Sequence, residues 1–298
     1  MNIIKNPEKK SWSKFLERPV FDFESLMKSI DDILKDVKKK GDQSVIDYTL
    51  KFDKVELDNI IVDHAEISSA KNEIGEDLKK AIKTAKTNIE LFHRAQKTDG
   101  ASCETTPGVR CWLKSFPIDK VGLYIPGGSA PLISTVLMLG VPAKLAGCSE
   151  IIVCSPPLPN GKIHPAILYA CDILEIKKIF KVGGAQAIAA MAYGTESVPA
   201  VYKIFGPGNQ YVTAAKLKVS LENIAIDMPA GPSEVAVIAD KYSNPAFIAS
   251  DLLAQAEHGV DSQVLLVTNS SVLIEKVMLE IDHQLDNLPR KDIAKKAL

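Results

Sequence analysis

The sequence predicts an α/β protein, because short β-branched strands alternate with helical segments from about residue 120 onward. We expect strands at 121–125, 151–155, 178–182, 201–205, 235–239 and 263–267. Helical segments lie between most of them, at 131–147, 164–174, 185–194, 209–221 and 244–259. This alternation is typical of a doubly wound parallel sheet with helices on both faces.

The first hundred residues are charged and mainly helical. Apolar residues recur with helical period at 25–39 and again at 76–97, and a further helix is expected through 47–52 with Asp42 as its cap. A single strand is expected at 59–63, and the stretch 107–126 alternates and turns in the manner of strands.

Charge and cysteine content exclude several classes of protein. The chain has 298 residues with 36 Lys and Arg against 37 Asp and Glu, so it lacks the basic surface that nucleic acids or anionic membranes require. The five cysteines lack CxxC spacing, which indicates neither a disulfide framework nor a thiolate zinc site. No signal-type apolar core is present, and Pro142 and Lys144 interrupt the longest apolar stretch. We expect a soluble cytoplasmic protein with a small-molecule partner, no nucleic acid and no membrane.

Glycine-rich loops lie where the expected strands lead into helices. They occupy 125–131, 182–186 and 205–209, and a further loop, 227–234, precedes a strand. Doubly wound sheets bind ligands beyond their C-terminal strand ends, and helix N-termini attract anions, so a phosphate-bearing cofactor would fit. Ordinary turns remain the alternative, because the usual dinucleotide fingerprint fails at Tyr211, where its third glycine would stand.

The helix expected at 244–259 carries a polar stripe. Asn244 can cap it, and Gly259 can end it. Asp251, Gln255 and His258 share one side at helical spacing, which suits either a metal site or a solvated face whose histidine favours the helix C-terminus. From this helix alone, the solvated face is favoured.

Several long blocks, taken together and in order, closely resemble histidinol dehydrogenase. They are 121–148, 182–199, 203–209, 226–234 and 250–263, and the stretches 39–54 and 107–111 also look like its N-terminal part. The resemblance implies oxidation of L-histidinol to L-histidine through the aldehyde, the last step of histidine biosynthesis. Two NAD are reduced in this reaction, and each site holds one zinc ion.

The same resemblance implies an aldehyde-dehydrogenase-like fold of two related doubly wound α/β/α domains, one inserted in the other, assembled as a homodimer. On that pattern residues 1–17 form an N-terminal arm. Residues 18–120 and 233–298 form an incomplete outer domain with a helical N-terminal region, and 121–232 form the inserted domain.

Site residues follow from the family motifs. Gln255 and His258 match two zinc ligands around which the substrate completes the coordination sphere, and Ser233 matches a residue that contacts substrate. Three residues match contacts to NAD: Tyr124, Gln186 and Asn209.

Each NAD residue also has a structural alternative. Tyr124 could simply pack its ring at a strand end, Gln186 could lie on a solvated first turn, and Asn209 could begin a helix. The alternative for Ser233 is a hydroxyl that ends a proline-stiffened turn.

Other reactive side chains receive structural interpretations. Glu257 projects away from His258 on the helix, and Asp251 suits a ligand-orienting group as well as a surface charge. Cys111 and Cys154 are interpreted as core thiols rather than as nucleophiles, because both lie in strand-like runs. The remaining histidines are interpreted as surface or capping residues: His64, His93, His164 and His283.

The family pattern continues beyond the position that matches Leu298. There it holds a Glu-His pair that serves as general base, then an Asp and a His that complete the zinc ligands. The resemblance therefore implies no catalytic base within these residues, a truncated sequence, and no turnover by this chain alone. Two alternatives stay open: a related zinc alcohol dehydrogenase of the sulfopropanediol type, and a non-catalytic nucleotide-binding fragment.

Overall fold

The computed structural model describes residues 1–17, 23–98, 100–127, 131–229, 234–260 and 262–298, with the side chains of 23–25 left undescribed. The chain forms two compact units. One unit comprises Phe23–Pro229, and the other comprises Met1–Asp22 with Ala230–Leu298. We describe each unit by itself.

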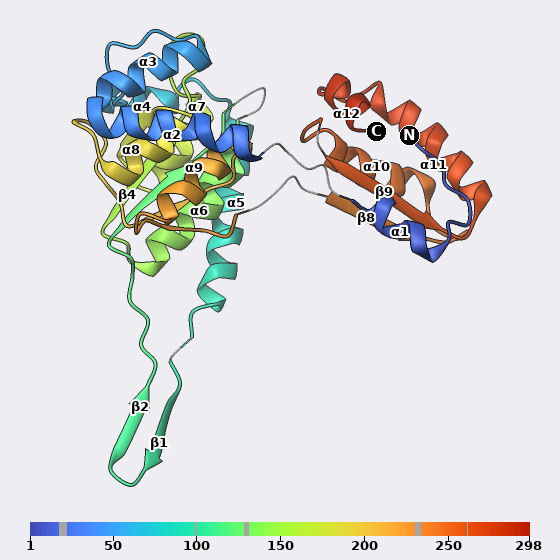
Figure 1. Cartoon of the computed structure of the whole chain (residues 1–298), viewed down its shortest axis with the longest axis horizontal. Coiled ribbons are helices and arrows are strands. Elements are labelled where there is room, and N and C mark those ends of the chain that lie inside the picture. Colours follow the sequence, from blue (N-terminus) through green and yellow to red (C-terminus); the bar gives the residue numbers. More distant parts are fainter. Residues whose placement is uncertain (18–22, 99, 128–130, 230–233, 261) are drawn as a thin grey trace. The chain divides into compact units, whose positions relative to one another are not determined.

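A parallel five-stranded sheet forms the centre of the unit Phe23–Pro229 (Figure 1). Its strands follow the order β5-β4-β3-β6-β7. The chain therefore moves outward from β3 to β5, returns to the other side of β3 as β6, and ends in β7. The α/β prediction with a parallel sheet is confirmed. The bounds are β3 Lys120–Tyr124, β4 Glu150–Ser155, β5 Lys178–Lys181, β6 Lys203–Phe205 and β7 Ala225–Ile226.

Helices cover both faces of this sheet, each over its own hydrophobic core. Strand residues alternate between the two cores: Leu123 and Val153 contribute to one, whereas Tyr124 and Cys154 contribute to the other. This period of two follows from the pleat of a strand buried on both sides. The first core lies under α4 His64–Ala70, α5 Glu76–Ala95, α6 Ile133–Ala146 and α7 Pro165–Ile173. The second lies under α2 Phe23–Lys40, α3 Asp42–Asp53, α8 Gly184–Tyr193 and α9 Gln210–Ser220.

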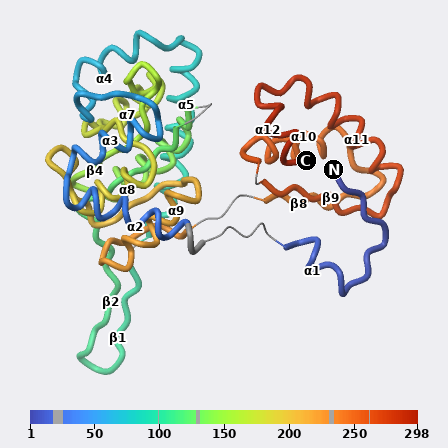
Figure 2. Tube along the Cα trace, turned by 45° about the horizontal axis from the view of Figure 1, so that its top comes forward, coloured from blue at the N-terminus to red at the C-terminus, as the bar shows by residue number. Residues whose placement is uncertain are grey.

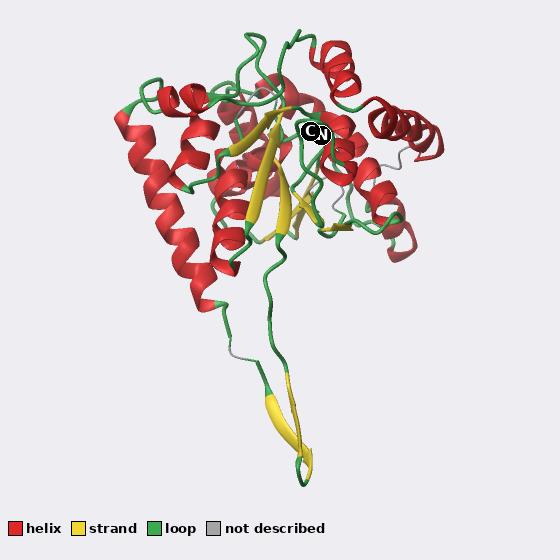
Figure 3. Cartoon of the chain, turned by 90° about the vertical axis from the view of Figure 1, so that its left-hand side faces the viewer, coloured by secondary structure: helices red, strands yellow, loops and turns green. Residues whose placement is uncertain are grey.

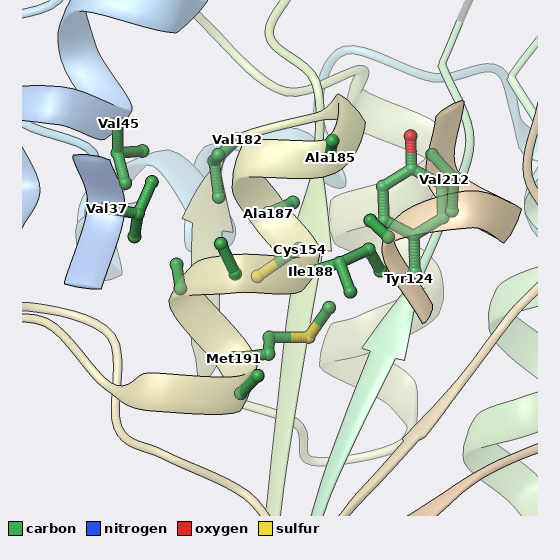
Figure 4. Close-up of a cluster of buried hydrophobic side chains, with 14 of the residues drawn as sticks. Val37, Val45, Tyr124, Cys154, Val182, Ala185, Ala187, Ile188, Met191 and Val212 are labelled. Atoms are coloured by element: carbon green, nitrogen blue, oxygen red, sulfur yellow. The ribbon is translucent and has the colours of Figure 1, made fainter. Parts of the chain in front are cut away.

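Helix α8 is buried along nearly its whole length (Figure 4). Small side chains such as Ala187 let it approach the sheet, while Ile188 and Met191 fill the space between helix and strands. Helix α2 packs on its outer side through residues such as Val37. A helix that is apolar all round is expected in such a buried position.

An antiparallel hairpin extends away from the sheet of this unit (Figure 3). It consists of β1 Ser102–Thr106 and β2 Val109–Trp112, and every residue of both strands is exposed. Trp112 is 68% exposed. The hairpin therefore has no core of its own.

The second unit is built on a parallel pair, β8 Glu234–Ala239 and β9 Gln263–Thr268, joined through α10 Pro245–Ala256 (Figure 2). Leu252 of α10, Leu273 of α11 and Ala294 of α12 belong to its core. The helices are α11 Ser271–Leu285 and α12 Lys291–Ala297, and the N-terminal residues add the short helices η1 Lys9–Ser11 and α1 Trp12–Phe15.

Several local predictions differ from the structure. Residues 59–63 form no strand but a single antiparallel bridge, Ile61 to Phe180, beside the edge strand β5. Asp42 does not cap α3 but is its first residue, because its carboxylate instead accepts hydrogen bonds from Thr195 and Ser197. Helices α4 and α11 were not predicted from the sequence.

The boundaries of the two compact units differ from those of the predicted domains. Residues 18–120 were grouped with 233–298, yet α2, α3, α4 and α5 pack on the sheet of residues 120–226. The physical reason is burial: Ile30 and Val45 are fully covered by this packing. An outer domain made of 18–120 with 233–298 stays a proposal drawn from the resemblance. Within the described residues, no helix combines the length and hydropathy needed to cross a bilayer.

Candidate cofactor cavity and metal-ligand helix

A cavity of about 1280 Å³ opens at the C-terminal ends of the parallel strands in the unit Phe23–Pro229. It is lined by Tyr124 and Ser155, the last residues of β3 and β4, by Gln186 in the first turn of α8, and by Asn209 after β6. The strand order reverses between β3 and β6, and such a switch point is where doubly wound sheets bind ligands. The three residues matched to NAD contacts therefore line one cavity.

Tyr124 lies at the end of β3 and is only 4% exposed. Its hydroxyl oxygen accepts a hydrogen bond from the backbone N–H of Gly184, 3.1 Å away, at the start of α8. Burial raises the pKa of Tyr124 to about 12, so the phenol is neutral at pH 7. Its ring packs in the core as the structural alternative supposed, while its hydroxyl reaches the cavity wall.

Three polar atoms of the cavity lining are buried without a hydrogen-bond partner among the described residues. They are Oε1 of Gln186, Oγ of Ser155 and Oδ2 of Asp53. Gln186 and Ser155 are each 1% exposed, so Gln186 does not lie on a solvated turn. Buried polar groups in native proteins are nearly always paired, and unpaired ones in a cavity indicate a ligand or water that pairs with them.

The carboxyl group of Asp53 ends α3 at the cavity wall. Desolvation raises the pKa of this carboxyl. The carboxylate of Asp36, on α2, differs from that of Asp53 in its partners. It accepts a hydrogen bond from Tyr48 at 2.8 Å and pairs with Lys40 at 2.9 Å. Lys35 and Lys51 also line the cavity and bring positive charge to it.

Asn209 caps helix α9. Its Oδ1 accepts from the backbone N–H groups of Tyr211 and Val212, both at 3.1 Å. The structural alternative for Asn209 is therefore correct, and it places this amide at the rim of the cavity. At the start of α8, the capping position belongs to Gly183, which has no side chain to satisfy the first-turn N–H groups. That helix end is suited to an anion.

Gln255 and His258 lie on adjacent turns at the end of α10. The helix ends at Ala256, earlier than the predicted Gly259, and the backbone N–H of His258 donates to the carbonyl of Gln255 at 3.1 Å. His258 is exposed and Gln255 half-buried. Nε2 of Gln255 lies 3.5 Å from Oγ of Ser262, which leaves its Oε1 as the atom for a metal.

An amide oxygen and a neutral imidazole are acceptable zinc donors, so the donor chemistry of this turn fits the metal. Two donors do not make a complete site. Among the described residues, no three His, Cys, Asp or Glu side chains gather closely enough to hold an ion. Ser233, matched to a substrate contact, lies outside the described residues.

Comparison with known proteins decides the family. The histidinol dehydrogenase family model matches residues 16–298. The chain belongs to the histidinol dehydrogenase family. Histidinol dehydrogenases of Bacteroides fragilis and Bacteroides thetaiotaomicron are 57% and 58% identical over all 298 residues, which span 70% of each relative. The crystal structure of histidinol dehydrogenase from Elizabethkingia anophelis is 51% identical, with a TM-score of 0.93 over 98% of this chain and 67% of that one.

The cysteines of this family member divide into two kinds. Cys154 is fully buried in β4, where burial strongly raises the pKa of its thiol, so its interpretation as a core residue is confirmed. Cys111 is exposed, so the same interpretation was wrong for it. The reason is that β2 belongs to the hairpin, both of whose faces are exposed. Among the histidines, His164 caps α7 as expected, because its Nδ1 accepts a hydrogen bond from the backbone N–H of Ala166.

Asp53 and Ser155 are cavity residues that the sequence did not single out. Ser155 ends a predicted strand, so the rule that ligands bind beyond strand ends could have drawn attention to it. Asp53 gives no such signal, because it is one of many acidic residues in the N-terminal helices and reaches the cavity only through the packing of α3.

Proposed function

We propose that the protein containing this chain oxidises L-histidinol to L-histidine, using NAD in the cavity of the unit Phe23–Pro229 and zinc at Gln255 and His258. Family membership supports the reaction and its place in histidine biosynthesis. The observation that carries the cofactor part is Oε1 of Gln186, which is buried in the cavity wall and has no hydrogen-bond partner among the residues that the structure describes.

The lining suits a dinucleotide. Oε1 of Gln186 and the carboxylate of Asp53 can only accept hydrogen bonds, so the ligand must bring donors, as ribose hydroxyls do. Lys35, Lys51 and the N-terminus of α8 attract its diphosphate. The cavity volume of about 1280 Å³ exceeds the usual 300–1,000 Å³ of small-ligand pockets, in keeping with an extended ligand.

When bound, NAD supplies the hydride acceptor and zinc supplies a positive charge that anchors the amino alcohol. The residues of this chain bind and orient. Tyr124 stays neutral and keeps its hydroxyl hydrogen free to donate, because the same oxygen already accepts from Gly184. Gln255, in the last turn of α10, and His258, in the turn that follows it, offer one oxygen and one nitrogen to the metal.

The cofactor placement is tested by titrating the 298-residue chain with NAD in a calorimeter. Wild type is expected to bind, and Gln186→Leu is expected to lose most of its affinity. Since Oε1 of Gln186 has no hydrogen-bond partner in the part of the chain that the structure describes, its removal should leave stability close to that of wild type, so a loss of affinity cannot be attributed to unfolding. Equal affinity in both proteins would refute this placement.

The reaction is tested in the whole protein by NADH formation from L-histidinol and, separately, from a sulfonated diol. Turnover with L-histidinol alone is expected. Turnover with the sulfonated diol alone would favour the related zinc alcohol dehydrogenase, and NAD binding without turnover on either would favour a binding fragment. The relatives named above are all histidinol dehydrogenases, which supports the first outcome.

We also propose, from the resemblance, a cytoplasmic homodimer. The exposed Val109 and Trp112 of the hairpin, with Phe116 beyond it, supply apolar surface of the kind that protein interfaces use. Light scattering during gel filtration tests the proposal. Trp112→Glu is expected to shift the whole protein toward the monomer, and a monomeric wild type would contradict it.

A further inference from the structure

We infer that the largely buried ion pair Lys216–Asp227 is a positioning device, a clamp that holds the N–H and C=O groups of Gly206 and thereby fixes the proposed cofactor-binding turn 206–209 in place. The inference rests on the proposed function, because it takes NAD as the occupant of the cavity. No role follows for either residue from the family motifs considered above, although Asp227 lies in the block 226–234.

The ion pair bonds to both backbone polar groups of Gly206, its N–H and its carbonyl oxygen. The N–H of Gly206 donates to Oδ2 of Asp227 at 2.8 Å, and the carbonyl oxygen of Gly206 accepts from Nζ of Lys216 at 2.9 Å. Lys216 also donates to Oδ1 of Asp227, which closes the triangle. Side-chain exposure is 6% for Lys216 and 29% for Asp227, so the pair lies largely out of solvent.

The position of Gly206 explains why such a hold is needed. Gly206 directly follows β6, at the switch point, and has a φ of +132° that side chains rarely adopt. A Cβ there would overlap the carbonyl oxygen of Tyr124, so the two backbones lie against each other. Where a buried residue lies outside the hydrogen-bond ladder of a sheet, its N–H and C=O groups need other partners. Side chains in fixed positions select one backbone conformation, whereas water would allow several.

Because the clamp fixes Gly206, it also restrains Asn209, which lies in the same turn. Pro207 stiffens the turn, and a Cβ at Gly208 would overlap the side chain of Val212, so the turn has little freedom. Asn209 then caps α9, and α9 carries Lys216 back to Gly206. The glycine turn leads into the helix that Asn209 caps, and the lysine of that helix bonds back to the turn. Asn209 lies at the rim of the cavity.

The energetics separate this role from simple packing. A buried charge pair costs desolvation free energy that an apolar pair of similar volume would avoid. Stability alone therefore does not explain why Lys216 and Asp227 stand there, whereas a fixed backbone at a binding turn does. The same helix offers a matched control, because Lys218 pairs with Asp31 of α2 at 2.8 Å without touching the turn.

The test combines cofactor affinity with hydrogen exchange on the 298-residue chain. Asp227→Ala and Lys216→Met are expected to weaken NAD binding about tenfold, equivalent to about 1.4 kcal/mol, and to speed amide exchange in the peptide 203–210. Asp227→Asn keeps an acceptor for the Gly206 N–H, so it should restore protection of that amide and part of the affinity. Lys218→Met should change neither quantity.

Several outcomes overturn the inference. They are unchanged affinity in folded Asp227→Ala, unchanged exchange at 203–210, and an equal loss in Lys218→Met, which would indicate a general effect of loosening α9. Should Lys216→Met fail to fold, Asp227→Asn and Asp227→Ala, at the more exposed partner, still decide the question. A wild-type chain that binds no NAD refutes the proposed function instead, and the exchange data still decide whether the clamp holds the turn.

Discussion

The hydroxyl of Tyr124 and the backbone N–H of Gly184 are joined by a hydrogen bond of 3.1 Å that links the end of β3 to the start of α8. The two residues are 60 positions apart in the chain, yet their bond ties together two of the loops that surround the cavity. The geometry of the cavity at this edge of the sheet therefore depends on a contact between the end of β3 and the start of the helix after β5, although β3 and β5 are not neighbours in the sheet.

Tyr124→Phe removes this acceptor and leaves the N–H of Gly184 without it. We expect a loss of about 0.5–1.5 kcal/mol in the free energy of unfolding, measured in urea, because a half-buried hydrogen bond is lost. NAD affinity should fall as well, by about tenfold, because the start of α8 is released. Tyr169→Phe is the control, since Tyr169 is also buried but outside the cavity lining. A loss no greater in Tyr124→Phe than in this control would contradict the prediction.

Asp53→Asn should stabilise the protein at pH 7 and weaken NAD binding. Burial raises the pKa of Asp53 in the folded state, so its ionisation opposes folding. The unfavourable effect is absent below the unfolded value of 3.8, sets in as pH rises through that value, and is complete above the folded pKa.

Thermal melting of Asp53→Asn at several pH values measures this effect. The gain in Tm over wild type should be present at pH 7 and should vanish toward pH 3. Asp58→Asn, at an exposed position in the segment that follows α3, should show no such gain. A pH-independent difference at position 53 would show that ionisation is not its cause.

The sequence predicted the strands and buried helices well, and for a physical reason. Segments such as 151–155 are short, β-branched and flanked by turn residues, so local preference and burial agree. Residues 59–63 looked the same locally, but their neighbour is the edge strand β5, and pairing is limited to one bridge at Ile61. No local pattern reports which edge a segment will meet.

The cavity was predicted in part. Tyr124 ends a strand, and Gln186 and Asn209 lie shortly after strands, and residues in such positions of a parallel sheet converge in space whatever the details of packing. Asp53 depends on how α3 lies over the strand ends, which is a tertiary property. The same holds for the contact between Lys216 and Gly206, because nothing in a ten-residue spacing indicates that a lysine turns back to cap a glycine carbonyl.

Asn209 has two roles that substitution can separate. Asn209→Leu should lose the cap of α9, at a cost of about 1 kcal/mol, and should also weaken NAD binding. Asn209→Ser keeps a capping oxygen but lacks the amide, so it should retain stability and lose affinity. Stability from urea unfolding and affinity from calorimetry test both together. Unchanged affinity in Asn209→Leu and in Gln186→Leu would defeat the placement of the cofactor.

His258→Ala in the whole protein should remove most of the bound zinc and nearly all turnover. The reason is that a site of nitrogen and oxygen donors loses affinity steeply with each ligand, and the substrate loses its anchor with the metal. The control is His283→Ala, because His283 is also exposed, lies in the same compact unit on α11, and has no matched ligand role. Metal content by mass spectrometry and NADH formation are measured on both variants. Full zinc occupancy after His258→Ala would mean that the end of α10 is structural and that the polar stripe of Asp251, Gln255 and His258 is a solvated face after all.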